Sequence, residues 1–203
     1  MSSRIRFNDA NDVFEAFPTL ARFAPAPTEP CEPLDYARRL NGMPPPQAAT
    51  AYVSHLLPRR EAVWWGCQCV SAVLGGAAQD QGFRLASRWV REPDDALRRE
   101  ALAYAQAGDL NAATAWLARA VGHSGGSLAA PDPPPALPAP DACAQSVNAA
   151  VIMAATRAPS PMILPWIRAC VESGVRFAAG EEARVIAPPV SRSGFPAAAP
   201  PAA

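Results

Sequence analysis

Lysine is absent from this chain. All eighteen basic residues are arginine, and eighteen aspartate and glutamate residues bring the formal net charge to zero. A nucleic-acid-binding protein usually carries a basic excess, so the balance disfavours nucleic acid as a partner. The exclusive use of arginine is typical of a GC-rich genome. The alternative explanation is selection for the bidentate contacts that a guanidinium group makes.

The chain also lacks an apolar run of about 18 residues, so no membrane span is expected. Its start, Met1 to Glu15, has no apolar segment and carries several acidic residues, which excludes an ordinary signal peptide. The five cysteines are odd in number and show no spacing typical of a disulfide framework. We therefore expect a cytoplasmic protein whose cysteines serve as small apolar side chains. They are Cys31, Cys67, Cys69, Cys143 and Cys170.

Strand-forming residues are sparse, and no segment alternates apolar and polar residues for long enough to indicate a sheet. Half of the residues are hydrophobic, and alanine contributes much of that share, which favours closely packed helices. Proline and glycine divide the chain into segments of helical length. The sequence therefore predicts an all-α fold, a compact bundle or a short solenoid-like array of about eight helices with proline-rich connections.

Composition predicts three regions. Residues 1–33 form an aromatic and proline-rich arm, which we expect to dock, most simply on the body of the same protein. Residues 34–180 form the helical domain. Residues 181–203 are rich in alanine and proline and are predicted to be disordered. Whether the arm docks in cis or in trans, and the oligomeric state, stay open.

One helical hairpin has a repeat-like pattern. Residues 97–121 resemble a single tetratricopeptide unit, with Gly108 and Asp109 at the turn and Asp109 as the expected cap of the second helix. No second copy follows at the spacing that a repeat array needs. The other matching positions are Leu97, Ala101, Tyr104, Leu110, Ala113, Leu117, Ala120 and Val121.

Candidate chemistry is scarce. Residues 122–126 fit the G-x-S-x-G pattern, which would make Ser124 a nucleophile beside His123 in a small hydrolase. That motif needs a strand before it and a helix after it, whereas here a helix precedes it and a proline-rich loop follows. Cys67 and Cys69 lie two residues apart on a helix and point about 200° apart, so they do not form a zinc half-site. We expect no catalytic residue, no metal site and no cofactor.

Residues 57–74 are the most informative segment. A helix there places Trp64 on its polar side and Trp65 at the shoulder of its apolar face, with Arg59 and Arg60 in the first turn. Tryptophan and arginine are enriched where proteins bind one another, so these four residues are the predicted partner-binding site. The alternatives are internal cover of Trp64, by the arm or a proline-rich strand, and pairing of the arginines with acidic residues of this chain.

Three segments carry a family resemblance: LPRREAVWW (57–65), SRWVREPDDALRREAL (87–102) and SGGSLAAPDPPP (124–135). With them, the chain from about Leu34 to Gly180 resembles a bacterial family of unknown function often found near type VI secretion genes. The resemblance implies an accessory role, such as an adaptor or chaperone for a secreted effector, and it carries over no catalytic residue.

These observations predict a non-enzymatic protein–protein interaction module, an adaptor or chaperone accessory to type VI secretion. Its expected partner is a protein, such as a secretion effector or a spike component. Two alternatives remain: a small hydrolase that uses Ser124 and His123, or an immunity protein that neutralises a toxin.

Overall fold

The computed structural model describes residues 3–129, 134–182 and 184–189. These residues form nine α-helices and three short 3-10 helices, and no strand occurs among them, which confirms the predicted all-α fold. The α-helices are α1 (Ala10–Ala16), α2 (Pro33–Gly42), α3 (Gln47–Leu56), α4 (Arg59–Leu74), α5 (Gln81–Arg91), α6 (Asp95–Ala107), α7 (Ala113–Gly122), α8 (Ala142–Ala155) and α9 (Ile163–Ala178).

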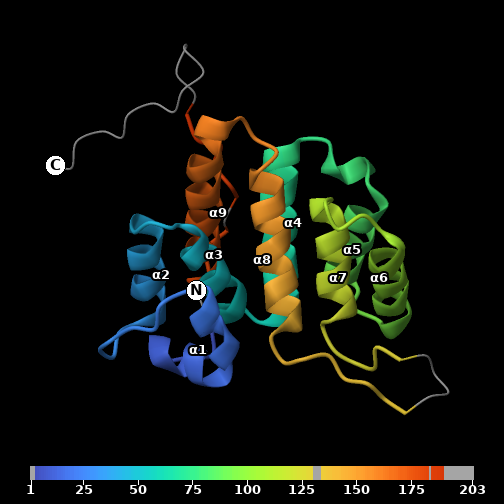
Figure 1. Ribbon diagram of the computed structural model, residues 1–203, viewed down its shortest axis with the longest axis horizontal. Coiled ribbons are helices and arrows are strands. Elements are labelled where there is room, and N and C mark those ends of the chain that lie inside the picture. Colours follow the sequence, from blue (N-terminus) through green and yellow to red (C-terminus); the bar gives the residue numbers. More distant parts are fainter. Residues whose placement is uncertain (1–2, 130–133, 183, 190–203) are drawn as a thin grey trace.

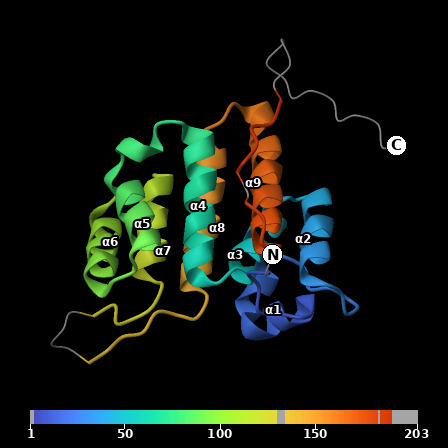
Figure 2. The ribbon, with the colours of Figure 1, turned by 180° about the vertical axis from the view of Figure 1, so that it is seen from behind.

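Helices α4 and α8 lie side by side at the centre of the molecule (Figures 1 and 2). Helix α8 also packs against α3, α7 and α9. Helices α5, α6 and α7 form one flank, and α2, α3 and α9 form the other, with α1 at the foot of that second flank (Figure 1). Both central helices begin at the lower end in this view, so their N-termini share one end of the bundle.

Small residues let these helices approach closely. A side-chain carbon at Gly66 of α4 would lie 3.0 Å from the Cδ2 atom of Leu117 in α7. One at Gly174 of α9 would lie 2.7 Å from the Cγ1 atom of Val53 and 2.8 Å from the Nε1 atom of Trp65. The alanine-rich composition therefore acts through close helix contacts, as protein interiors have little free space.

The N-terminal arm docks on its own chain. Asp9 and Asp12 form a capping box that starts α1. The ring of Phe14 in α1 stacks on Tyr52 of α3 with a centroid distance of 5.9 Å. The backbone N–H of Arg4 donates to the Ala178 carbonyl at 2.9 Å, so the start of the arm meets the end of the helical body.

The expected helical hairpin is present, but one detail of it is wrong. Helices α6 and α7 pack against each other, whereas Asp109 does not cap α7, which begins at Ala113 after Ala112. The Asp109 carboxylate instead accepts the backbone N–H of Asn111 at 2.9 Å. The residues after Asp109, which were expected to form the first turn of the helix, therefore form a separate turn before α7 begins.

Of the C-terminal tail, residues 181–203, the structure describes residues 181–182 and 184–189. Residues 184–189 have no regular secondary structure, and Val185 packs against the core. The guanidinium group of Arg176 donates to the Arg184 carbonyl at 3.0 Å. Residues 190–203 of the segment predicted to be disordered lie outside the described residues.

Candidate functional site

Trp65 of the predicted partner-binding set lies inside the core. Its side chain is fully buried, and its indole N–H donates to the Cys170 carbonyl of α9 at 2.9 Å. Direct contact between this side chain and a partner would require the core to open.

Trp64 is half-buried, and α9 covers one face of its ring. Its indole stacks on Phe177 with a centroid distance of 4.1 Å and an interplanar angle of 19°. The guanidinium group of Arg4 lies 4.2 Å from the centroid of the same Phe177 ring. Internal cover of Trp64 therefore comes from α9, with the N-terminal arm contacting the covering ring.

Arg59 and Arg60 tie the first turn of α4 to neighbouring backbone. Arg60 donates to the carbonyls of Val90 at 2.7 Å and Arg91 at 3.2 Å, at the C-terminus of α5. A cation is favoured there because the last carbonyls of a helix carry partial negative charge. Arg59 donates to the carbonyls of Ser124 at 2.9 Å and Pro140 at 3.4 Å. Within the described ranges, neither arginine pairs with a carboxylate.

A groove runs between α4 and α5 on the side of Trp64. One part of it, beside Trp64, has a volume of about 220 Å³, and another part of about 510 Å³ continues along α5. Ser87 and Arg91 line both parts, so they form one continuous surface, named here the α4–α5 groove. The other lining residues are Trp64, Cys67, Gln68, Phe83, Arg84, Arg88, Val90 and Glu92.

The α4–α5 groove combines apolar and basic side chains. Arg84, Arg88 and Arg91 are exposed and recur at the spacing of one helix face. Arg84 and Arg91 donate to nearby backbone carbonyls, while Arg88 has no hydrogen-bond or ion-pair partner among the described residues. Glu92 is the acidic residue that lines the groove. The surface therefore keeps a local positive balance in a chain of zero net charge.

Cys67 contributes no reactive group to this groove. Burial raises the pKa of its thiol to about 12, so the side chain stays protonated at neutral pH, and a thiolate is the form that attacks or binds metal. Among the described residues, no group of three or more histidine, cysteine, aspartate or glutamate side chains could hold a metal ion.

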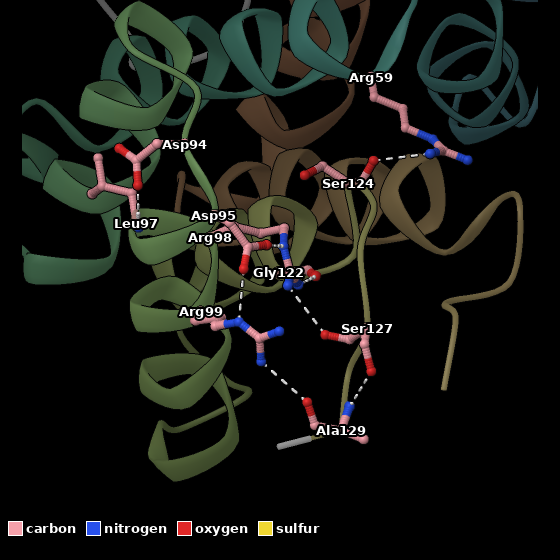
Figure 3. A network of polar contacts seen from close by, with 10 residues as sticks. All are labelled: Arg59, Asp94, Asp95, Leu97, Arg98, Arg99, Gly122, Ser124, Ser127 and Ala129. Carbon is pink, nitrogen blue, oxygen red and sulfur yellow. Dashed lines mark hydrogen bonds and ion pairs between the residues drawn. The ribbon is translucent and has the colours of Figure 1, made fainter. Parts of the chain in front are cut away.

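Arginines of α6 hold the loop after α7 (Figure 3). The side chain of Arg98 is 5% exposed and contacts Asp95 at 2.7 Å. It also donates to the carbonyls of Gly122 and Ser127, both at 3.1 Å. Arg99 pairs with the same Asp95 at 2.7 Å and donates to the Ala129 carbonyl at 3.1 Å. The hydrogen bonds that Arg98 and Arg99 donate to the Asp95 carboxylate lower the pKa of that carboxyl group, and the bond from Arg98 is the larger cause.

Gly126 is required in this loop for two reasons. Its φ of 63° lies in the left-handed region that favours glycine. A side-chain carbon there would also lie 2.8 Å from the Nη2 atom of Arg98. Because Arg59 holds Ser124 of the same loop, all three segments of the family resemblance meet at residues 122–129 (Figure 3).

Ser124 and His123 lie together but are not joined as a nucleophile and its base. They follow the end of α7 rather than a strand, and no hydrogen bond links the Ser124 hydroxyl to a histidine in the described part of the chain. The Nδ1 atom of His123 is buried with no partner there. Burial, with a smaller contribution from Arg119, lowers the pKa of His123. The ring borders a small cavity of about 120 Å³ between α6, α7 and the loop.

The sequence did not single out Phe177, Arg88 or Arg98. The spacing of Arg84, Arg88 and Arg91 was the available signal for a basic helix face. The position of Asp95 three residues before Arg98 and four before Arg99 was the signal for the paired arginines. Nothing local could indicate Phe177, because it meets Trp64 from a helix more than a hundred residues further along.

A family model described as a family of unknown function, DUF6931, matches residues 36–178. The matched range covers α3 to α9 and most of α2, and it contains the α4–α5 groove and the loop that the arginines hold. Nothing in the match concerns type VI secretion or tetratricopeptide repeats. No curated protein and no solved structure matches the chain. No helix in the described part is both long and apolar enough to cross a membrane.

Proposed function

The chain belongs to the DUF6931 family, and from that premise we propose that it is a non-enzymatic module that binds another protein through the α4–α5 groove. The observation that carries this proposal is that the exposed side chains of Arg84, Arg88 and Arg91 line the same groove as large apolar side chains. Trp64 and Phe83 supply large apolar surface, and aromatic and arginine side chains dominate the binding energy of many protein interfaces.

The groove chemistry favours one kind of partner segment. Three exposed arginines and one acidic residue, Glu92, line this surface, so an acidic segment with apolar residues complements both its charge and its apolar side chains. Complementary charge speeds association and selects the partner. Arg88 has no partner within the described chain, so its donors are free for a carboxylate, and such charge-assisted bonds are strong.

The finer proposal is that this module is an adaptor or chaperone accessory to type VI secretion, and that its partner is a secretion effector or a spike component. It rests on the resemblance carried by segments 57–65, 87–102 and 124–135. An immunity protein that neutralises a toxin would use the same groove. It differs in that its partner is a folded, active toxin.

A hydrolase is the alternative from another class. It draws on the adjacency of His123 and Ser124 and on the cavity beside His123. Replacing Ser124 by alanine would abolish hydrolysis and leave binding in the groove unchanged. The side chain of Ser124 takes no part in the hydrogen bonds that hold its loop, since its carbonyl accepts from Arg59.

The test is capture of partners from native lysate by tagged protein, with an Arg88→Glu variant and an Arg168→Glu control. Arg88 and Arg168 are both exposed, so the change in charge is matched, and Arg168 does not line the groove. We expect a partner with an acidic, apolar segment that Arg88→Glu loses and Arg168→Glu retains. Its capture should weaken as salt rises, because salt screens exposed charges.

A partner held equally by both variants would refute the groove as the binding surface. Loss in both would show an effect of net charge, and would refute it as well. A Trp64→Leu variant that still unfolds cooperatively provides a second check, because it removes groove surface without changing charge.

A further inference from the structure

The N-terminal arm meets the C-terminus of α9 at Arg4. The backbone N–H of Arg4 donates to the Ala178 carbonyl at 2.9 Å. Its guanidinium group donates to the carbonyls of Phe177 at 2.5 Å and Glu181 at 3.1 Å. The last carbonyls of a helix have no partner within it, and a cation is favoured beside them. Arg4 therefore ties the arm to the last turn of α9 and to the residues that follow it.

The same guanidinium group lies on the ring of Phe177. Its central carbon is 4.2 Å from the ring centroid, and the Trp64 indole stacks on that ring at a centroid distance of 4.1 Å. Two groups this close to one centroid would collide on a single face, so Arg4 and Trp64 lie on opposite faces of Phe177. A displacement of Arg4 therefore changes the surroundings of Trp64 through this buried ring.

Trp64 is the residue through which this contact reaches the α4–α5 groove. It lines the groove, whereas the described residues of the arm and of α9 do not. No hydrogen bond from the described residues fixes its indole N–H, in contrast to Trp65, whose N–H donates to the Cys170 carbonyl. The stack on Phe177 is therefore a principal restraint on the orientation of the Trp64 ring.

The order of Trp64 matters for binding in the groove. A side chain that a partner must first order costs conformational entropy, and this cost lowers the affinity. Tryptophan is also among the residues whose contacts dominate the binding energy of protein interfaces. The affinity of the groove should therefore depend on how firmly the stack holds Trp64.

We infer that Arg4 is a positioning residue for the α4–α5 groove. It holds Phe177 against Trp64, and the groove has its binding-competent wall only while the arm is docked. This inference rests on the proposed function of the groove. Coupling between two sites is reciprocal, so a partner in the groove also stabilises the docked arm. The arm thereby regulates a surface that it does not touch.

The first measurement is ¹⁹F NMR of the full-length protein labelled with 5-fluorotryptophan. The chain has five tryptophans, and a Trp64→Phe variant assigns the Trp64 signal. In Arg4→Leu we expect that signal to shift and broaden, because Phe177 loses the cation on the face opposite Trp64. Arg22→Leu removes the same charge and should leave the signal in place. Arg22 is exposed on the same arm and makes no hydrogen bond or ion pair with the described residues.

A double-mutant cycle tests whether Arg4 acts through Phe177. Phe177→Leu removes the ring that joins Arg4 to Trp64, so Arg4→Leu should change the Trp64 signal no further in that background. Urea unfolding confirms that each variant folds. If Phe177→Leu does not fold, the comparison of Arg4→Leu with Arg22→Leu decides the question.

The second measurement is the affinity of a synthetic peptide, the blocked hexapeptide Glu-Leu-Glu-Glu-Leu-Glu, by isothermal titration calorimetry. Its acidic and apolar residues represent the partner class proposed for the groove. We expect Arg4→Leu to weaken its binding by about two- to fivefold, the range that an exposed cation–π contact supplies. Arg22→Leu, with the same loss of charge, should bind the peptide as the wild type does.

The two proposals fail in different ways. A peptide that binds Arg88→Glu as well as the wild type would contradict the groove as the binding surface, and the Trp64 signal would still measure the effect of the arm. An unchanged Trp64 signal in Arg4→Leu would overturn the positioning role, as would equal changes in Arg4→Leu and Arg22→Leu. Peptide affinity that stays the same in Arg4→Leu while the Trp64 signal moves would overturn the regulation of the groove.

Discussion

Replacing Arg98 by leucine should lower the free energy of unfolding by about 3 kcal/mol. The change leaves the carbonyls of Gly122 and Ser127 without the donor that each now meets at 3.1 Å, and an unpaired buried polar group costs about 1–3 kcal/mol. Loss of the contact with Asp95 adds little, because that carboxylate is 60% exposed and keeps its contact with Arg99.

Arg99→Leu is the matched control. Arg99 contacts the same Asp95 at the same 2.7 Å and donates to one carbonyl of the same loop, but its side chain is 36% exposed against 5% for Arg98. Water can replace the lost donor there, so we expect a cost below about 1 kcal/mol. The two substitutions remove the same charge and the same kind of contact with Asp95, but they differ in burial and in the number of loop carbonyls that lose a donor, two for Arg98 and one for Arg99.

Urea unfolding followed by tryptophan fluorescence and far-ultraviolet circular dichroism gives both free energies. The slope of the free energy of unfolding against urea concentration should be the same for all variants if they differ only in stability. In the Arg98→Leu variant, the pKa of Asp95 should also rise towards its ordinary value of 3.8, because its largest cause of depression is gone. Equal costs for the two substitutions, or a cost below about 1 kcal/mol for Arg98→Leu, would refute the argument from burial.

Two further predictions concern the core. Gly174→Ala should destabilise the fold by about 2 kcal/mol through overpacking, since the new carbon meets Val53 and Trp65; Gly42→Ala, with nothing within 4 Å, is the control, and an equal cost in urea would contradict this. Because burial lowers the pKa of His55 from 6.5, the unfolded state takes up a proton first, so the free energy of unfolding should fall as pH drops below 6.5. His55→Gln should flatten that slope relative to the wild type, and an unchanged slope would contradict the assignment.

The sequence predicted the all-α fold and a number of helices close to that observed, because composition and the spacing of proline and glycine are local signals. The starts of α5 and α6 are local as well: the carboxylates of Asp80 and Asp94 accept from the N–H groups of Gly82 and Leu97, at 2.7 and 2.8 Å. Such caps depend on residues two or three positions apart, so the sequence contains all that decides them.

Contacts between segments that lie far apart in the chain could not be predicted from the sequence. Trp65 was placed at the shoulder of the apolar face, yet α9 encloses it and supplies the Cys170 carbonyl that its N–H needs. Asp141 precedes α8 but does not cap it, because its carboxylate accepts from Thr19 of the arm and from Gln145. Cys170 and Thr19 both come from segments whose positions only the tertiary fold determines.

The docking of the arm has a consequence for the order in which a ribosome delivers this chain. Arg4 finds its partner in Ala178, and Trp65 finds its own in Cys170. Both bonds need α9, so neither forms until almost the whole helical body has been synthesised. A nascent chain stalled before α9 would keep the contact of Phe14 with Tyr52 but would lack the partners of the Arg4 backbone and of the Trp65 indole.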